Sequence, residues 1–175
     1  MPEDRKKAGN HLKRGKYIYN GPAVFGAYAG SPIEWSILDV SGGHMLLISR
    51  EIVAERQYHE TDDMRTSWKG CTLRKWLNGD FISSAFDREE RAMIDSVETD
   101  AGCEDRVFLL SRQEVTDPDL FKDDDARKGG GMYWLRSLPG YGDMADAVSI
   151  SGFITRADKN KGDVGVRPVI WVDLT

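Results

Sequence analysis

The sequence predicts an α+β fold, with short antiparallel strands, two small helices and long loops. Short apolar stretches that alternate with polar residues recur along the 175 residues, and Gly-rich turns separate them. Two segments combine a helix-capping signal with apolar residues three and four positions apart. Long polar stretches, such as residues 116–131, lie between these elements. The length suits one domain.

The first strands are expected in the N-terminal third of the chain. Residues 21–30 are rich in Gly and small side chains and suit a turn with a short strand. Residues 33–40 and 44–49 are apolar stretches, and Ser41, Gly42 and Gly43 separate them. Two apolar stretches joined by such a short turn predict a β-hairpin.

Two short helices are expected next. Thr72 is placed to cap a helix over residues 72–77, where apolar side chains recur at spacings of three and four. Asn78-Gly79 is a typical helix end. Asp87 and Glu90 form the D-x-x-E pattern of a capping box, which predicts a second short helix.

The second half of the chain predicts further strands. Residues 106–110 are an apolar stretch, and Ser111 with Glu114 repeats the capping-box pattern directly after it. Gly152 suits a bend or turn within the alternating residues 147–155. Strands are then expected within residues 132–137, 147–155 and 165–174.

Composition excludes several classes of function. The net charge of −5 argues against nucleic-acid binding and against attraction to an anionic membrane. Basic side chains nevertheless gather in residues 1–16, which we interpret as a solvated N-terminal arm that precedes one domain over residues 17–175. A small patch for an acidic partner is the alternative. These side chains are Arg5, Lys6, Lys7, Lys13, Arg14 and Lys16.

The sequence shows no secretion signal and no apolar stretch long enough to cross a membrane. The expectation is therefore a soluble, cytoplasmic chain, or display on a cell or virion surface if the domain belongs to a larger protein. Cys71 and Cys103 lie far apart in the sequence and match no metal-binding spacing. Two reduced core thiols are expected, and a single disulfide remains the alternative.

Six motifs occur in order along residues 22–174: FGAYAGSPIEWSILDV, LLISREIV, CTLRKWLNGDFISSAF, VFLLSRQEV, YWLRSLPG and GVRPVIWV. Together they resemble a bacterial and phage domain family of unknown function with a WLRS and GVRP signature. That family is similar to the C-type-lectin-like fold of formylglycine-generating enzymes and of the variable proteins of diversity-generating retroelements. The resemblance implies a C-type-lectin-like fold with a tendency to bind ligands.

Two arginines stand beside large apolar residues. Arg136 follows Trp134, and Arg167 lies in the strand that contains Trp171. We interpret all four residues as structural, because a guanidinium can satisfy several carbonyl groups at once and a loop-rich fold has many of them. Binding of ligand anions is the alternative for the two arginines. The carboxylates proposed as arginine partners are Glu34, Asp39, Asp105 and Asp146.

A ligand site is expected on the loops between the C-terminal strands. The resemblance implies that such loops display the ligand-facing residues, and here they are residues 138–146 and 155–163. They combine an aromatic side chain with charges of both signs, which suits a binding surface. The ligand-binding candidates are Tyr141, Asp143, Arg156, Asp158, Lys159 and Asn160.

These features favour a non-catalytic module that recognises a protein or a glycan, without nucleic acid, membrane or cofactor. The sequence contains no hydrolase, zinc-protease or P-loop motif, and no catalytic residue is assigned. Calcium binding by Asp158, Asn160 and Asp163 is a minor alternative. Two other functions stay open: an enzyme distantly related to formylglycine-generating enzymes, and a structural part of an intracellular or phage assembly. The oligomeric state cannot be inferred from the sequence.

Overall fold

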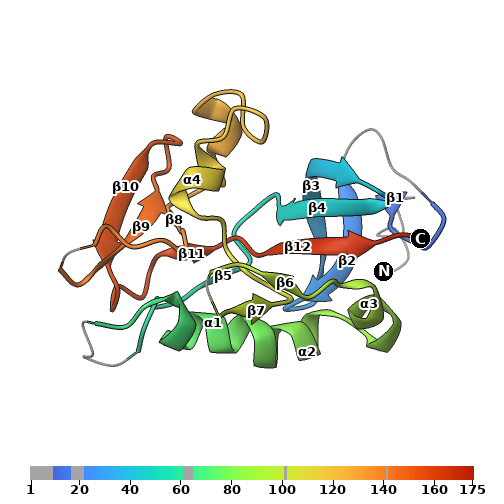
Figure 1. Cartoon of the computed structure of the whole chain (residues 1–175), viewed down its shortest axis with the longest axis horizontal. Helices are drawn as coiled ribbons and strands as arrows, with labels where there is room; N and C mark the ends of the chain where they lie inside the picture. The colour runs from blue at the N-terminus through green and yellow to red at the C-terminus, as the bar shows by residue number, and fades with distance from the viewer. Residues whose placement is uncertain (1–9, 17–21, 61–64, 101, 141) are drawn as a thin grey trace.

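The chain folds into two five-stranded sheets that lie side by side along its longest axis, with helices along one flank (Figure 1). The computed structural model describes residues 10–16, 22–60, 65–100, 102–140 and 142–175. Short strands and a few short helices confirm the predicted α+β class. No helix in the described part of the chain is long and apolar enough to cross a membrane.

The first sheet contains the predicted N-terminal hairpin. Its third and fourth strands pair antiparallel around the turn at Gly42 and Gly43, as expected. The short first strand pairs parallel with the second, and Leu12 beside it is buried, so part of the predicted arm belongs to the fold. In sheet order the strands are β1 (Asn10–His11), β2 (Ala23–Tyr28), β3 (Ser31–Ser41), β4 (His44–Ser49) and β12 (Val169–Asp173).

The second sheet is built mainly from the C-terminal third of the chain. The edge strand at one side and the strand next to it form a hairpin, and the turn of this hairpin contains the bend predicted at Gly152. Its fourth strand runs parallel to the third and antiparallel to the fifth. In sheet order the strands are β10 (Ile154–Asp158), β9 (Met144–Val148), β8 (Tyr133–Trp134), β11 (Gly165–Val166) and β5 (Ala54–Glu55).

The single strand predicted over residues 165–174 is wrong, because the chain changes sheets at Arg167 and Pro168. β11 belongs to the second sheet and β12 to the first. Residues 50–53 make the same crossing between β4 and β5. Pro168 has no N–H to leave unpaired at the break, and its carbonyl accepts a hydrogen bond from the Ser49 N–H at 3.0 Å. We call residues 50–53 and 167–168 the seam.

The helices lie on the flank shared by both sheets, apart from α4 (Figure 1). The two predicted capping boxes are confirmed at the starts of α3 and α4. A short ladder of β6 (Val97–Glu98) with β7 (Glu104–Asp105) follows α3. The helices are α1 (Thr72–Trp76), a π-helical turn (Leu77–Phe81), α2 (Ile82–Ala85), α3 (Arg88–Met93) and α4 (Arg112–Val115), with short 3-10 turns at Trp68–Gly70 and Asp125–Arg127.

The predicted helix end at Asn78-Gly79 is wrong, since the helix continues through a π-helical turn into α2. Asn78 explains the difference, because its side chain pairs with the backbone of a neighbouring segment. Its Oδ1 accepts hydrogen bonds from the N–H groups of Arg106 and Val107, and its Nδ2 donates to the Val107 carbonyl at 2.8 Å. The residue at the N-cap is Cys71 rather than Thr72.

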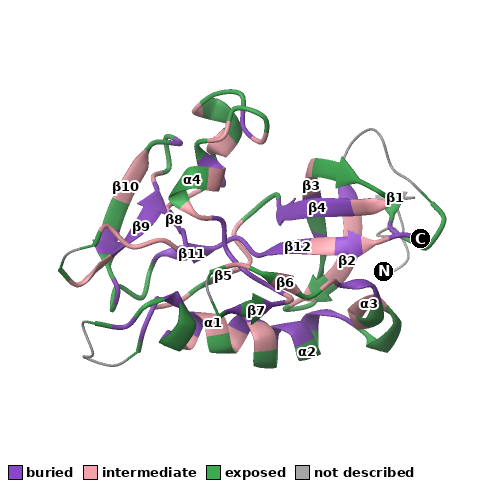
Figure 2. Cartoon of the chain, in the orientation of Figure 1, coloured by how far each residue is buried: buried purple, intermediate pink, exposed green. Residues whose placement is uncertain are grey.

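The core joins both sheets to the helices, and Figure 2 shows buried residues along β4 and β9, whereas β3 and β10 carry exposed residues. Trp35, Trp68 and Trp134 are fully buried, and Trp171 is half-buried. Trp68 is buried although its sequence neighbours are polar, and its indole N–H donates to the buried carboxylate of Asp105 at 2.9 Å.

Candidate functional site

Arg136 is buried, and its side-chain partners all come from residues 99–114. Its guanidinium donates to the carbonyl of Leu109 at 2.8 Å and to that of Thr99 at 3.2 Å. It also pairs with the carboxylates of Asp100 and Glu114. The acids proposed from the sequence are therefore not its partners. Arg136 makes the contacts of a structural clamp, because each of its nitrogen atoms has an acceptor within the fold.

Arg167 lies buried in the seam. Its Nε donates to the Ser49 carbonyl at 2.9 Å, and its two terminal nitrogens donate to the carbonyls of Arg127 and Arg50 at 3.2 and 3.3 Å. The guanidinium also stacks over the ring of Tyr133, 4.7 Å from the ring centre. Burial lowers the pKa of Arg167. Its printed contacts are to backbone carbonyls and an aromatic ring, so Arg167 ties the two crossings of the seam together.

The structure brings the two predicted ligand loops together at one end of the β9–β10 hairpin. The N–H of Lys159 donates to the carbonyl of Asp143 at 2.8 Å. Asp158 and Asn160 are exposed, and Asp143 is half-buried. The Lys159 side chain is buried, and its ammonium donates to the Thr66 carbonyl at 2.8 Å, so it faces the interior.

The remaining ligand-binding candidates from the sequence are Tyr141 and Arg156. Tyr141, the aromatic candidate, lies outside the described residues. Arg156 is exposed on β10, directly opposite the buried Asp146 on β9. The Oδ1 atom of Asp146 is buried without a hydrogen-bond partner. Asp163, one of the three calcium candidates, pairs with Lys161 at 3.2 Å.

The other end of the same hairpin carries a feature that the sequence reasoning missed. Ile150 and Phe153 in the β9–β10 turn are 66% and 57% exposed. The sequence predicts the bend at Gly152 but not the exposure of the apolar side chains around it. The turn at residues 150–151, closed by the bond from the Gly152 N–H to the Ser149 carbonyl, directs Ile150 and Phe153 into solvent. The available signal was the Ser-Gly pair between two bulky apolar residues.

The turn is held in place by its own hydrogen bonds and by the polar loop beside it. The Ser149 N–H donates to the Phe153 carbonyl at 2.8 Å, and the Gly152 N–H returns to the Ser149 carbonyl at 2.9 Å. From the loop, Arg127 donates through Nε to the Gly152 carbonyl at 3.0 Å. The exposed apolar side chains therefore stand on a fixed backbone.

The strand beside this turn is a sheet edge. β10 is the outermost strand of the second sheet, and within the described part of the chain no strand pairs with its outer side. Arg156 and Asp158 are exposed along it. We call Ile150, Phe153, Arg156, Asp158 and Asp143 the hairpin surface.

The described cysteines are not arranged for nucleophilic chemistry. Cys71 and Cys103 are buried free thiols. Burial raises the pKa of Cys71 to about 11, whereas a reactive cysteine needs a lowered pKa. A groove of about 350 Å³ lies between residues 28–34 and 50–53, and its charged lining includes the exposed pair Glu34–Arg50. Neither histidine nor cysteine is among the described residues that line it.

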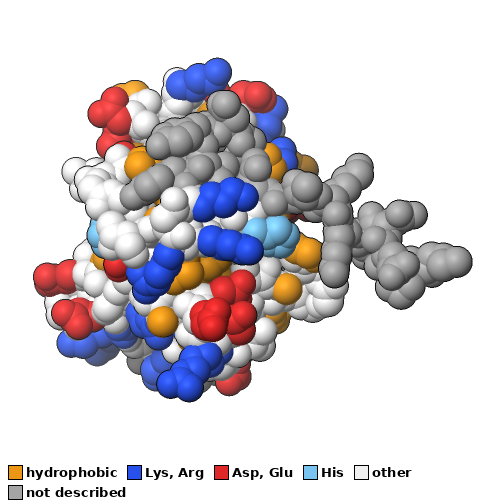
Figure 3. Space-filling view, turned by 90° about the vertical axis from the view of Figure 1, so that its right-hand side faces the viewer, with side chains coloured by type: hydrophobic (Ala, Val, Ile, Leu, Met, Phe, Trp, Pro, Cys, Tyr) orange, Lys and Arg blue, Asp and Glu red, His pale blue; other side chains and the backbone are white. Residues whose placement is uncertain are grey.

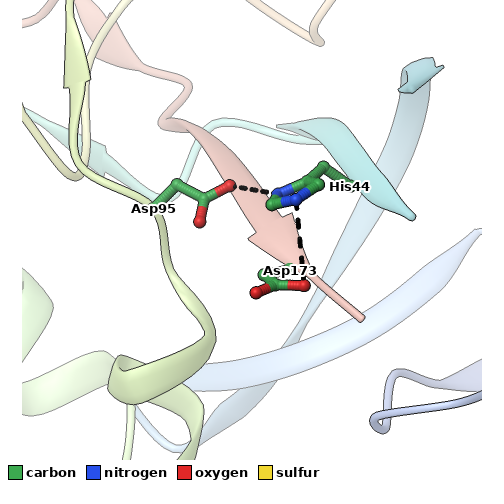
Figure 4. A group of neighbouring side chains, drawn as sticks. All are labelled: His44, Asp95 and Asp173. Carbon is green, nitrogen blue, oxygen red and sulfur yellow. Dashed lines mark hydrogen bonds and ion pairs between the residues drawn. The ribbon is translucent and has the colours of Figure 1, made fainter. Parts of the chain in front are cut away.

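One cluster of metal-ligating side chains stands out in the described part of the chain: His44, Asp95 and Asp173 (Figure 4). His44 begins β4, Asp173 ends β12, and the two are paired residues in neighbouring strands. Asp95 follows α3, and its N–H donates to the Trp171 carbonyl at 2.9 Å, which fixes this segment against β12. Residues far apart in the sequence therefore meet at the end of the first sheet.

Hydrogen bonds shift the pKa of two groups in this cluster. The Nδ1 atom of His44 lies 2.6 Å from Asp95 Oδ2, and this bond raises the pKa of the imidazole. Asp173 Oδ1 accepts from the N–H and the hydroxyl of Thr175, which lowers the pKa of that carboxyl. Arg14 Nη1 lies 3.9 Å from the other oxygen of Asp173. Figure 3 shows basic, acidic and histidine side chains close together on this end of the molecule.

The fold and these surfaces define a two-sheet α+β domain with a buried aromatic core and an exposed hairpin. The chain belongs to the family described as domain of unknown function DUF6273, whose model matches residues 42–174. A comparison with curated proteins and a comparison with solved structures each found no match.

Proposed function

We propose that this domain is a non-catalytic binding module that recognises a protein partner through the hairpin surface. The observation that carries the proposal is the exposure of Ile150 and Phe153, at 66% and 57%, on a turn with a fixed backbone. Large apolar side chains lose favourable burial when they stay in water, so a braced, exposed pair suits a surface that another molecule covers.

The edge strand β10 offers a second means of binding a protein partner. An extended segment of a partner can pair with the free edge of β10 through backbone hydrogen bonds, while Ile150 and Phe153 contact its apolar side chains. Arg156 and Asp158 would then select the partner by charge. The resemblance to C-type-lectin-like domains implies ligand-facing residues in loops 138–146 and 155–163, so it supports the part of the hairpin surface that contains Asp143, Arg156 and Asp158.

A protein fits this surface better than a glycan does. Sugar-binding platforms use the flat faces of exposed Trp and Tyr rings, and in this chain the tryptophans are buried or half-buried. An aliphatic Ile150 beside Phe153 makes a surface that suits the apolar side chains of a peptide. The raised pKa of Cys71 and the lining of the groove give the alternative of an enzyme no specific support.

Site-specific crosslinking tests the proposal. A photo-crosslinking amino acid is placed at position 153 of the full chain in the host cell, and crosslinked products are identified by mass spectrometry. The same amino acid at position 40 is the matched control, because Val40 is also a large exposed apolar residue but lies in the first sheet. We expect a defined protein crosslinked from position 153 and not from position 40.

A binding measurement with the identified partner then completes the test. The double variant Ile150→Ser with Phe153→Ser should weaken binding by at least about tenfold, because apolar contacts at the centre of an interface carry much of the affinity. Val40→Ser should leave it unchanged. The proposal fails if the two positions crosslink alike or if the double variant binds as tightly as the wild type.

A further inference from the structure

We propose that His44 and Asp173 bind a divalent transition-metal ion of the zinc class, with Asp95 holding the imidazole in the binding orientation. This site lies at the end of the first sheet, whereas the hairpin surface belongs to the second sheet. The two proposals therefore rest on different residues, and either can fail without the other.

The sheet itself brings the two ligands together. His44 and Asp173 are directly paired residues of the antiparallel ladder between β4 and β12, so their side chains lie on the same side of the sheet. Because both side chains project from paired strands, their separation is set by backbone hydrogen bonds. A site on regular strands is held more rigidly than one on loops.

Asp95 orients the imidazole. The 2.6 Å contact between Asp95 Oδ2 and His44 Nδ1 places the proton on Nδ1 when the ring is neutral, so the lone pair is on Nε2. Metal-ligating histidines commonly donate their other N–H to a carboxylate in this way. Figure 4 shows the opposite side of the ring facing Asp173.

The remaining distance suits an intervening ion. His44 Nε2 and Asp173 Oδ1 are 3.9 Å apart, which is too long for a hydrogen bond. A zinc–nitrogen and a zinc–oxygen bond are each about 2 Å long, so a zinc ion in a straight line between the two atoms would hold them about 4 Å apart. If His44 Nε2 and Asp173 Oδ1 approach each other by about half an ångström, the N–Zn–O angle becomes bent, as a tetrahedral site requires. Oδ1 already accepts hydrogen bonds from the N–H and the hydroxyl of Thr175, so the ion must replace the bond from the rotatable hydroxyl, while the N–H bond holds the Asp173 carboxylate.

The ligand types select the metal. An imidazole with a carboxylate suits zinc, copper or nickel, whereas calcium and magnesium prefer oxygen ligands alone. Two protein ligands leave the other coordination positions to water. The half-exposed side chains of His44 and Asp173 leave room for those waters, with 37% and 28% of each side chain exposed.

Zinc titration tests this site on the full chain without an affinity tag. The protein is first treated with a chelator, and ZnCl₂ binding is then measured by calorimetry at a pH of about 8, above the ordinary pKa of a histidine side chain. CoCl₂ serves as a spectroscopic probe of the coordination geometry. We expect one saturable site, which His44→Ala and Asp173→Asn each abolish.

Further variants separate a metal site from a purely structural ion pair. Asp95→Asn should weaken zinc binding by about 10- to 100-fold, the usual effect of losing the group that orients a ligand. Arg14→Ala should tighten it, because Arg14 places a competing cation 3.9 Å from Asp173 Oδ2. The control variants are His11→Ala and Asp163→Asn, an exposed histidine and an exposed aspartate outside the cluster, and both should bind zinc normally.

Circular dichroism checks that each variant is folded, and Asp173→Asn keeps the experiment informative if His44→Ala is unstable, since Asn preserves the side-chain shape. The proposal is overturned if the wild type shows no saturable zinc binding. It is equally overturned if folded His44→Ala or Asp173→Asn protein binds zinc as the wild type does.

Discussion

At the scale of single residues, the structural role of the two buried arginines could be predicted from the sequence, but their partners could not. Their apolar neighbours indicated a structural role, and the guanidinium groups indeed bond to backbone carbonyls. Their partners could not be read from sequence, because Arg167 and Ser49 are 118 positions apart. The acids chosen by composition were wrong: Arg136 pairs with Asp100 and Glu114.

Replacing Arg167 tests its role in the seam. Arg167→Met keeps much of the side-chain volume but removes the donor to the carbonyls of Ser49, Arg50 and Arg127, of which that of Arg127 keeps a hydrogen bond from the Tyr133 hydroxyl. We expect the free energy of unfolding to fall by about 2 to 3 kcal/mol, since hydrogen bonds from a charged group contribute about 1.5–3 kcal/mol. Urea denaturation measures the change. Arg50→Met is the control, because its side chain is 51% exposed and should cost less than about 0.5 kcal/mol. Equal losses would contradict the prediction.

At the scale of elements, local signals were predicted well and long-range ones were not. Both capping boxes and the β3–β4 hairpin were found, because each depends on residues a few positions apart. The helix end at Asn78 was missed, since its side chain is used by a segment 28 and 29 positions away. The strand break at Arg167 was missed because both halves are equally apolar, and the sheet to which each half belongs is decided by distant strands.

The β9–β10 turn provides a test at this scale. Gly152 has a φ of +88°, and an added Cβ would lie 1.9 Å from the Asp124 carbonyl oxygen. Gly152→Ala must therefore move the turn away from the neighbouring loop, and we expect a loss of stability of at least about 2 kcal/mol from strain and displacement together. Thermal denaturation gives the comparison.

The control for this variant is Gly30→Ala. Gly30 has a similar φ of +81°, but an added Cβ would meet nothing within 4 Å. It should therefore cost only the backbone strain, about 1 to 2 kcal/mol. If the two variants lose the same stability, the turn is not braced by the loop, and the fixed backbone beneath Ile150 and Phe153 would lose its support.

At the scale of the whole molecule, the sheets decide where the folding unit begins. The family model starts at residue 42, but β1, β2 and β3 precede it and are three of the five strands of the first sheet. Trp35 on β3 is fully buried, and its indole N–H donates to the Phe25 carbonyl at 2.7 Å. The matched residues alone would leave one edge of β4 and the core beneath it open to water.

Two shortened chains test this boundary. A chain of residues 10–175 should unfold cooperatively, because it keeps both sheets. A chain of residues 42–175 lacks β1, β2 and β3, so we expect it to aggregate or to melt without a cooperative transition. Near-UV circular dichroism during heating distinguishes the two outcomes. A sharp transition in the shorter chain would show that the first sheet does not need its N-terminal strands.

The candidate sites also differ in how much of each could be predicted from local sequence. The two loops that the sequence assigns to a ligand site lie near each other, because the Lys159 N–H donates to the Asp143 carbonyl, and their role in binding stays a prediction. The cluster of His44, Asp95 and Asp173 could not be inferred, since its members come from three distant segments. Nor could the exposure of Ile150 and Phe153, which depends on whether another element covers the turn.

The change of sheet at Arg167 and Pro168 also constrains the order of folding. Residues 165–173 supply a strand to each sheet, and β11 lies between β8 and β5 while β12 pairs with β4. During synthesis, neither sheet can therefore be completed until residues 165–173 have left the ribosome. Until then the unpaired sides of β4, β5 and β8 are open to contacts with other nascent chains, so a chaperone that shields strand edges would act mainly in that interval.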